Sequence, residues 1–476
     1  MRRTKIVATV GPASSDPDVL RSMIGAGLDV ARIGLAHGTL DDHLAMYWRL
    51  RDAAEATGSD IGILIDLPGP KVRCARFADG GTALADGQAI TVVAGTDASD
   101  STRIEIDYES VASDVMVGDQ LAIGDGNITL MVEGKSDAVV DARIIHGGLA
   151  QGRPGFQIPS ERLRLSTPTA EDLEFVDAFV DVGVDMIAVS FVRSAHDMRG
   201  IRTQPAPAGP LLVAKIETRA AVENLDGIIE TSDAVMVARG DLGLDFPIAE
   251  LPHLQKHIIG QCVARSRPVI TATQMLESMV HSTIPTRAEA TDVANAVFDG
   301  TSAVMLSGET AIGDDPVNAI ETMARITERA DEEFDRDSWI QVIQRHVGDD
   351  HDAGSASVRT DALSLAACEI AEKIGAMAIL CLTRTGFTAQ SITRFRPEVQ
   401  VLAFTPDSRT ARQLRLSWGT TPTQNLEHPT SREVAEQAMT DLRERNELMS
   451  GDLVVVVSGQ SLLTRSTDTL RVVTVP

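Results

Sequence analysis

Short apolar runs recur from Lys5 to Leu306, and segments with helical spacing of apolar positions separate them. Continuous apolar runs of this length are typical of strands that are buried on both faces, as in a parallel sheet. Strands that alternate with helices predict βαβ units, and eight such strands predict a closed (β/α)8 barrel. The predicted strands are Lys5–Val10, Leu28–Ile33, Ile61–Leu67, Asp185–Phe191, Leu211–Ile216, Ala234–Arg239, Pro268–Thr273 and the segment SAVMLSGET, which ends at Ser307-Gly308-Glu309.

The alternation is interrupted once, between the third and fourth predicted strands. From about Cys74 to Pro159 the helical pattern disappears, and short strands separated by Gly and Asp turns replace it. An all-β insertion after a strand end would lie over the carboxyl edge of the barrel, where a lid belongs. We therefore assign residues 1–73 and 160–340 to a catalytic barrel and residues 74–159 to a lid.

A polar, acidic stretch from Ala330 to Ser357 is predicted to be a domain junction. Beyond it, three apolar runs alternate with helical segments, which predicts a C-terminal α/β domain over residues 355–476. Thr383, Thr385 and Thr388 lie between a strand and a helix of this domain, where hydroxyls and amides are able to hold a phosphate. A plain helix cap explains the same residues equally well.

Charged residues follow the fifth and sixth predicted strands. Alternation along a strand places Lys215 and Glu217 on one face, and Asp241 reaches the same edge one βα unit later. Active sites of (β/α)8 barrels lie at this edge because the strand-to-helix loops meet there. Two carboxylates beside a lysine form a site for a hard cation and an anionic substrate. The alternative is a surface ion pair at a strand end.

The composition restricts the classes of partner. The formal net charge is −25, and aromatic residues make up only 3% of the 476 positions. So negative a chain is not expected to bind nucleic acid or an anionic membrane, and local cations, amides or a metal must hold any phosphorylated ligand. The four scattered cysteines are typical of reduced thiols, and no apolar run has the length of a signal peptide or a membrane span. We therefore expect a cytoplasmic protein.

Several motifs, in this order along the chain, resemble those of the pyruvate kinase family. They include TKIVATVGPASS, DVARIGLAHG, DLPGPKVR, VAKIE, SDAVMVARGDLG, RPVITATQMLESM and VMLSGETAIGDDP, and they extend over nearly the full length. The resemblance implies transfer of a phosphoryl group from phosphoenolpyruvate to ADP, which gives pyruvate and ATP. It also implies a homotetramer as the usual assembly.

The resemblance implies a role for each candidate residue. Glu217 and Asp241 would hold Mg²⁺ or Mn²⁺, and Lys215 would face the phosphoryl group and the enolate oxygen. Arg32 would clamp the phosphoryl group, and Thr273 would orient proton delivery to the enolate carbon through a water chain. The remaining positions are Ala238, Gly240 and Asp241 for the substrate carboxylate, Arg73 and His37 for the nucleotide phosphates, and Ser190 and Ser307 at the rim. A strand-end cap explains the two serines as well as a direct role does.

The chain departs from the family's usual pattern at the monovalent-cation site. The usual form binds K⁺ through the Asn and Ser of ARxNxSHG and the Asp-Thr of DTKGPE. Those positions are Gly34, Ala36, Asp66 and Leu67 in this chain. Three of the four side-chain oxygens are gone, so a K⁺ site of that kind cannot form. Lys71 replaces the Glu of the second motif, and its ammonium would supply the charge of the missing ion, as in the potassium-independent branch of the family. We therefore expect activity without K⁺.

Two further departures concern the nucleotide and the effector. The segment STPTAEDLEF, which contains Pro168, lacks the lysine that the family brings to the nucleotide near this point, so nucleotide affinity or choice would differ. The loop from Ser458 to Arg465 lacks the glycine-rich, basic character of a fructose-bisphosphate clamp. The effector is left open.

Three functions remain in competition at this point. The first is an active, K⁺-independent pyruvate kinase. The second is a paralogue that keeps the barrel and metal site but senses a metabolite or carries altered phosphoryl chemistry. The third, from the fold alone, is a Schiff-base aldolase that uses Lys215. Glu217 lies so near the lysine that a metal site is favoured over a Schiff base.

Overall fold

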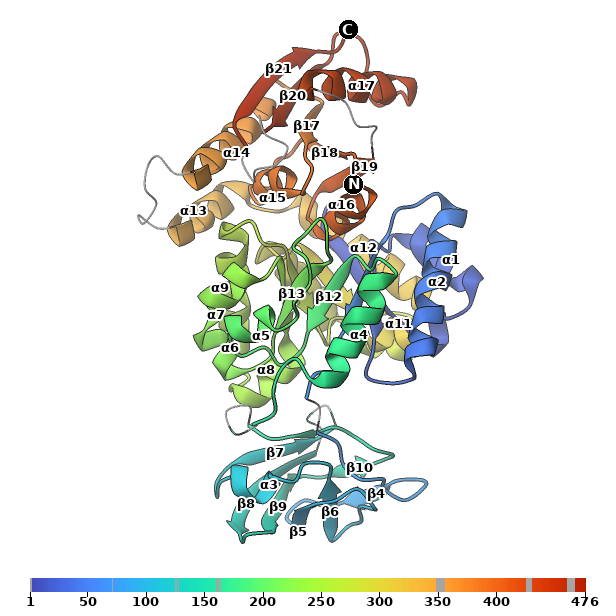
Figure 1. Ribbon diagram of the computed structural model, residues 1–476, viewed down its shortest axis with the longest axis vertical. Helices are drawn as coiled ribbons and strands as arrows, with labels where there is room; N and C mark the ends of the chain where they lie inside the picture. The colour runs from blue at the N-terminus through green and yellow to red at the C-terminus, as the bar shows by residue number, and fades with distance from the viewer. Residues whose placement is uncertain are drawn as a thin grey trace.

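The computed structural model describes residues 2–70, 72–124, 126, 128–159, 162, 164–347, 356–424, 430–459 and 467–476. The barrel forms the middle of an elongated molecule, the all-β insertion lies at one end, and the C-terminal domain lies at the other (Figure 1). This arrangement confirms the predicted fold class. None of the described helices is long and apolar enough to cross a membrane.

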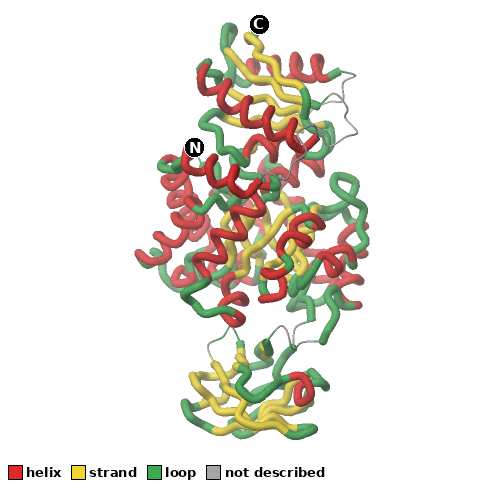
Figure 2. Tube along the Cα trace, turned by 90° about the vertical axis from the view of Figure 1, so that its left-hand side faces the viewer, coloured by secondary structure: helices red, strands yellow, loops and turns green. Residues whose placement is uncertain are grey.

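The barrel closes in the order β1-β16-β15-β14-β13-β12-β3-β2, with parallel neighbours. Each strand overlaps a predicted apolar run, and in most of them every residue is buried, as expected for a sheet with helices outside and packed side chains inside. Figure 2 shows the helices around the strands. The strands are β1 (Lys5–Val10), β2 (Val30–Gly34), β3 (Gly62–Asp66), β12 (Met186–Val189), β13 (Leu211–Ile216), β14 (Ala234–Ala238), β15 (Val269–Ala272) and β16 (Ala303–Leu306).

Side-chain caps fix where several barrel helices begin. The Asp16, Thr39, Thr169 and Thr286 side chains each accept a hydrogen bond from a backbone amide in the first turn of the helix that follows. The helices are α1 (Pro17–Ala26), α2 (Leu40–Thr57), α4 (Ala170–Asp181), α5 (Ala195–Arg199), α6 (Arg219–Glu223), α7 (Leu225–Thr231), α8 (Arg239–Asp245), α9 (Leu251–Ala264), α10 (Arg287–Phe298), α11 (Gly308–Ala311) and α12 (Pro316–Glu332).

The lid has a sheet and a hydrophobic core of its own. A six-stranded sheet in the order β11-β7-β8-β9-β5-β6 lies beside a two-stranded sheet, β10-β4. Alternate residues of the strands are buried, and their apolar side chains pack around Phe77. The elements are β4 (Thr82–Leu84), β5 (Ala89–Ala94), β6 (Arg103–Ile106), α3 (Val111–Asp114), β7 (Gln120–Ile123), β8 (Ile128–Lys135), β9 (Val139–His146), β10 (Gly148–Ala150) and β11 (Phe156–Gln157).

The C-terminal domain is a five-stranded sheet in the order β19-β18-β17-β20-β21, whose last pair is antiparallel. Its elements are α14 (Ala356–Lys373), β17 (Ala378–Leu382), α15 (Phe387–Thr393), β18 (Gln400–Thr405), α16 (Ser408–Gln413), β19 (Thr420–Gln424), α17 (Ser431–Glu444), β20 (Leu453–Ser458) and β21 (Thr469–Thr474). The predicted junction from Ala330 to Ser357 is not a plain linker, because it contains α13 (Arg336–Val347). Trp339 and Ile343, one turn apart, are buried and hold this helix against the barrel.

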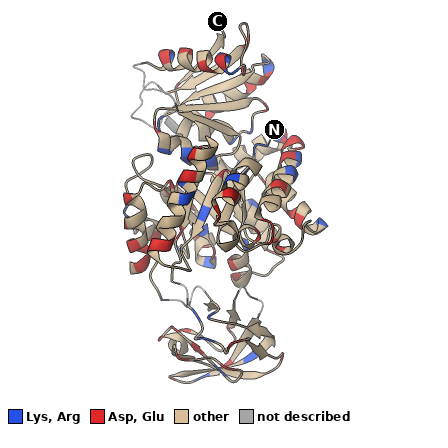
Figure 3. Ribbon diagram, turned by 90° about the vertical axis from the view of Figure 1, so that its right-hand side faces the viewer, with Lys and Arg blue, Asp and Glu red and all other residues tan. Residues whose placement is uncertain are grey.

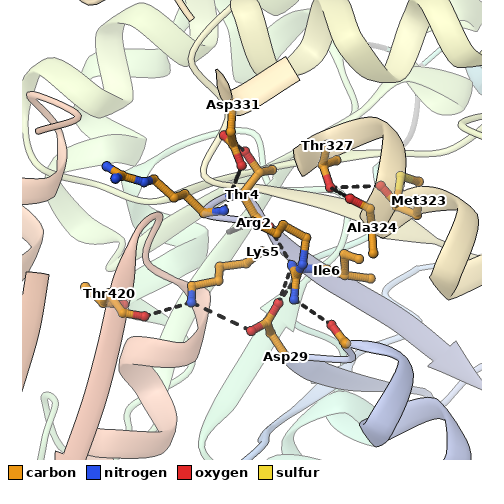
Figure 4. A network of polar contacts seen from close by, with 12 residues as sticks. Arg2, Thr4, Lys5, Ile6, Asp29, Met323, Ala324, Thr327, Asp331 and Thr420 are labelled. Carbon is orange, nitrogen blue, oxygen red and sulfur yellow. Dashed lines mark hydrogen bonds and ion pairs between the residues drawn. The ribbon is translucent and has the colours of Figure 1, made fainter. Parts of the chain in front are cut away.

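Polar contacts join the start of β1 to the C-terminal domain (Figure 4). This domain lies at the end of the barrel away from the lid (Figure 1). The buried Lys5 ammonium donates to the Thr420 carbonyl at 2.8 Å and lies 3.7 Å from Asp29, which also accepts from Arg2 at 2.7 Å. Burial lowers the pKa of Lys5 to about 8, although Asp29 opposes the change. This end of a barrel is ordinarily concerned with stability.

Candidate active site

A cleft of about 1150 Å³, open to solvent, lies at the carboxyl edge of the barrel where lid strand β11 meets it. Ends of several barrel strands contribute to its wall, as expected for a (β/α)8 fold. Many of the acidic residues of this chain lie on helices outside the barrel (Figure 3). Of the predicted site residues, the cleft is lined by Arg32, Asp66, Ser190, Lys215, Glu217, Ala238, Asp241, Thr273 and Ser307.

Lys215 is the centre of a buried polar network on one wall of the cleft. Its ammonium lies 2.8 Å from Glu217 and 3.2 Å from Asp66, and it donates to the Ser190 hydroxyl at 2.7 Å. Only 12% of the side chain is exposed. Burial lowers the pKa of Lys215, but Asp66 and Glu217 raise it by more, so the pKa lies above its ordinary value. The lysine is therefore a fixed positive charge at neutral pH.

Asp66 joins Lys215 to Arg32. Its buried carboxylate accepts from the Arg32 Nε at 2.7 Å and from the Ser190 hydroxyl at 3.3 Å. Burial raises the pKa of Asp66, but Arg32 and Lys215 together bring it below its usual range. The Arg32 guanidinium also donates to the Thr9 hydroxyl at 2.9 Å, a contact that the sequence did not suggest. Ser190 is thus a member of this network and more than a strand-end cap.

The three positions that have lost the family's oxygens surround this network. Gly34 and Ala36 line the cleft, and a Cβ at Gly34 would lie 3.7 Å from the Arg32 guanidinium. Leu67 is 1% exposed and belongs to the main hydrophobic core of the barrel. Lys71, which was predicted to replace the ion, lies outside the described residues.

Glu217 and Asp241 offer oxygens to the same cleft. One Glu217 oxygen accepts from the Phe191 amide at 2.6 Å, and the other faces Lys215. Asp241 follows β14 and accepts from the Gln157 side-chain amide of the lid at 3.5 Å. The described residues contain no cluster of three or more His, Cys, Asp or Glu side chains able to hold a metal. Two carboxylates at an open cleft suit Mg²⁺, which commonly takes one or two protein carboxylates and completes its shell with water and substrate oxygens.

Thr273 is held in a left-handed conformation, with φ 67°, directly after β15. Its hydroxyl accepts from the Gly240 amide at 2.8 Å and donates to the Ala272 carbonyl at 2.7 Å. The Arg239 guanidinium donates to the Thr273 carbonyl at 2.6 Å and pairs with Asp292 at 2.6 Å. Arg239 was missed by sequence reasoning, although it stands in the motif VARGDLG. It fixes the strained turn that presents the threonine.

Arg73 and His37 lie at the rim, where the first lid connection leaves the barrel. Arg73 donates to the Ala36 carbonyl at 2.9 Å, which ties the lid connection to the loop that carries the exposed His37. Arg153, also missed by sequence reasoning, pairs with Asp107 at 3.3 Å, and its carbonyl accepts from Arg73 at 3.5 Å. Two guanidinium groups therefore flank the base of the lid.

The remaining predicted positions lie away from the cleft. Pro168 directly precedes Thr169, the N-cap of α4, so this position carries no cation. The Thr383 hydroxyl accepts from the Gly386 amide at 2.9 Å, and the Thr388 hydroxyl contacts Thr467 at 3.0 Å. Both belong to the C-terminal domain, as does the half-buried Thr385. These contacts suit a capped loop, and the loop at 460–466 lies outside the described residues.

Comparison with known proteins identifies the family. The model of the pyruvate kinase barrel domain matches residues 1–320, and that of the pyruvate kinase alpha/beta domain matches residues 361–473. A pyruvate kinase of Agrobacterium vitis is 40% identical over 478 residues, covering 99% of this chain and 98% of its own, and one of Mycobacterium tuberculosis is 37% identical over 460 residues, covering 96% and 95%. The crystal structure of a pyruvate kinase from Cryptosporidium parvum superposes with a TM-score of 0.88 at 31% identity, covering 100% of this chain and 96% of its own. The chain with this cleft therefore belongs to the pyruvate kinase family and is a phosphotransferase.

Proposed function

We propose that this protein is an active pyruvate kinase that transfers a phosphoryl group from phosphoenolpyruvate to ADP with Mg²⁺ and without K⁺. The observation that carries the proposal is the buried Lys215 ammonium, which faces the same cleft as Arg32, Asp241 and Thr273. A fixed positive charge is what an enolate leaving group needs, because negative charge develops on its oxygen as the bond to phosphorus breaks.

The positions of the chain's own residues support a role for each of them in this reaction. Arg32 holds the phosphoryl oxygens, and Arg73 with His37 holds the nucleotide phosphates at the rim. The phosphorus–oxygen bond of the enol phosphate breaks while a terminal ADP oxygen forms the new bond to phosphorus. The electron pair stays on the enolate oxygen, where Lys215 stabilises it.

The enolate carbon then takes a proton to give pyruvate. Thr273 lines the cleft, and its hydroxyl is oriented by Gly240 and the Ala272 carbonyl. A threonine hydroxyl is too weak an acid to be consumed in this step, so it orients a water chain that delivers the proton. The amides near Ala238 bind the substrate carboxylate, although that of Gly240 is engaged by Thr273 in the described structure.

Glu217 and Asp241 are the residues that would hold the divalent cation. Mg²⁺ bound there supplies positive charge against the substrate oxygens. The position of the Glu217 carboxylate is fixed on both sides. One oxygen accepts a hydrogen bond from the Phe191 amide, and the other lies beside the Lys215 ammonium.

Independence from K⁺ is supported by the charge balance around Asp66. Its carboxylate is within hydrogen-bonding distance of two cationic groups, those of Arg32 and Lys215, and its pKa is lowered accordingly. Leu67 is buried and has no side-chain oxygen to offer. The negative charge of Asp66 is therefore neutralised by side chains and does not require a monovalent ion.

The Schiff-base alternative is disfavoured by the same network. An aldolase lysine needs a lowered pKa so that its amine is free to attack a carbonyl. The pKa of Lys215 is raised because Asp66 and Glu217 outweigh burial, so the amine is protonated at working pH. Borohydride with a carbonyl substrate should therefore fail to trap it.

A coupled assay with phosphoenolpyruvate, ADP and Mg²⁺, with and without KCl, tests the proposal. We expect turnover that changes less than threefold when KCl is added and that disappears when Mg²⁺ is chelated. Stimulation by several hundred-fold would contradict K⁺ independence. Absence of turnover under all conditions would instead favour the metabolite-sensing paralogue. A homotetramer and a cytoplasmic location accompany the proposal, and analytical ultracentrifugation tests the first.

A further inference from the structure

Gln157 is a side chain of the lid that contacts Asp241 at the predicted cation site. It ends β11, the strand that pairs with β7 of the lid sheet, and it lines the cleft together with Glu217 and Asp241. Its amide nitrogen lies 3.5 Å from an Asp241 oxygen, which is the far limit of a hydrogen bond. The lid and the barrel therefore meet at one of the two carboxylates proposed to bind the cation.

The other end of the Gln157 amide is unsatisfied. Its carbonyl oxygen, Oε1, is buried and has no hydrogen-bond partner in the described structure. Leaving a buried carbonyl unpaired destabilises a folded protein, so such atoms call for an explanation. A second pocket is lined by the same two carboxylates and also by Gln157. Gln157, which carries the unpaired oxygen, thus lines two cavities that share Glu217 and Asp241 as walls.

An amide oxygen in this place has the chemistry that a hydrated divalent cation requires. Mg²⁺ and Mn²⁺ bind hard oxygen ligands, and the waters that they retain donate hydrogen bonds to nearby carbonyls. The amide nitrogen meanwhile donates to Asp241 and orients that carboxylate. One side chain is able to satisfy both demands, because Gln carries a donor and an acceptor at its tip.

We propose that Gln157 is a positioning residue that couples the lid to the divalent-cation site. The inference rests on the proposed function, since it takes Glu217 and Asp241 as the cation's ligands. Coupling of this kind is reciprocal: the factor by which the lid contact tightens cation binding equals the factor by which the cation favours the lid position. Binding of the cation is therefore linked to the Gln157–Asp241 contact before any substrate is present.

The test uses the full chain with Mn²⁺ alone, without phosphoenolpyruvate or nucleotide. Gln157→Met removes the amide while keeping the length of the side chain, and Gln157→Glu keeps an oxygen at its tip. Gln120→Met, at an exposed position of the paired strand β7, is the matched control. Electron paramagnetic resonance of free Mn²⁺ gives the Kd, and hydrogen exchange of lid-base amides with and without Mg²⁺ gives the lid response.

We expect the Mn²⁺ Kd to rise about tenfold in Gln157→Met, as is typical when a second-layer partner of a metal ligand is lost. Gln157→Glu should bind within threefold of wild type or more tightly, and Gln120→Met should match wild type. Mg²⁺ should slow exchange at the lid base in wild type and Gln120→Met but not in Gln157→Met. A Kd in Gln157→Met within twofold of wild type would overturn the coupling.

The same measurements separate failure of this inference from failure of the proposed function. Asp241→Asn should abolish Mn²⁺ binding if the carboxylate is a ligand. If wild type binds no Mn²⁺, or if Asp241→Asn binds it normally, the cation site itself is wrong and the coupling falls with it. If wild type binds Mn²⁺ through Asp241 and Gln157→Met leaves the Mn²⁺ Kd unchanged, only the role of the lid contact is refuted.

Discussion

Replacing Lys215 with Met tests the centre of the proposed mechanism. The ammonium is held by three oxygens, at 2.7 Å from Ser190, 2.8 Å from Glu217 and 3.2 Å from Asp66, so it is oriented before the substrate arrives. Preorganised donors in a partly buried site are each worth about 10²–10³ in turnover. A full positive charge beside the leaving oxygen should contribute about 10⁴ in turnover, or about 5 kcal/mol of transition-state stabilisation.

The substitution also removes a cation from a buried pair. Losing one partner of such a pair costs about 3–5 kcal/mol. We expect the low end of that range for Lys215→Met, because Asp66 keeps its contact with Arg32 and Glu217 keeps the Phe191 amide. The protein should therefore fold, and circular dichroism should report native secondary structure with a lowered melting temperature.

The assay is single-turnover and steady-state transfer to ADP, with Mn²⁺ binding measured on the same samples. We expect kcat to fall between about 10²- and 10⁴-fold while Mn²⁺ still binds. Lys215→Arg keeps the positive charge in a different geometry, so its kcat should lie between those of wild type and Lys215→Met. Because the pKa of Lys215 lies above its ordinary value, wild-type kcat/KM should show no ionisation of this group between pH 7 and pH 10. Turnover of Lys215→Met within tenfold of wild type would refute the reasoning.

Other positions give independent tests. Asp66→Asn removes the carboxylate that pairs with Arg32 and Lys215, so the free energy of unfolding measured with denaturant should fall by about 3–5 kcal/mol. A fall of less than about 1 kcal/mol would contradict the proposed charge balance. Thr273→Val should slow exchange of pyruvate methyl protons at least tenfold, whereas Thr273→Ser should retain it; equal rates would exclude the hydroxyl. For Lys5, the lowered native pKa of about 8 means that between pH 8 and about 10.4 the unfolded chain binds a proton that the native chain has released. The free energy of unfolding relative to that of Lys5→Met should therefore rise across that window by up to about 1.4 kcal/mol per pH unit. A difference that does not change with pH would refute the lowered pKa of Lys5.

The barrel was predictable because each of its strands leaves two local signals. One is a run of mostly apolar residues, and the other is a polar residue at or near its end, as in β13, where Lys215 follows four buried or partly buried residues and Glu217 comes directly after the strand. Elements without an apolar run escaped. Two examples are β19, with the sequence TTPTQ, and the largely exposed β21. Both form strands because they pair with the edge of a neighbouring strand, which cannot be predicted from local sequence. For α13, the apolar pair Trp339 and Ile343 inside an acidic stretch was a helical signal that the overall charge obscured.

The site divides in the same way. Lys215, Glu217 and Asp241 were found because strand ends and family motifs mark them. Arg239 and Gln157 were not, since their importance lies in contacts with Thr273 and Asp241, which are 34 and 84 residues away along the chain. Positions of that kind become visible only when the barrel has closed and the lid has been placed over it.

The place of β1 in the barrel has a consequence for how the chain folds as it is made. This first strand pairs with β2 on one side and with β16 on the other, and Lys5 at its start contacts Thr420 of the C-terminal domain. Synthesis at about 5–20 residues per second separates β1 from β16 by roughly 15–60 s. During that time an apolar strand has one free edge, which is a template for pairing with other chains. The nascent protein should therefore be most prone to aggregation, and most dependent on chaperones, until its eighth barrel strand emerges.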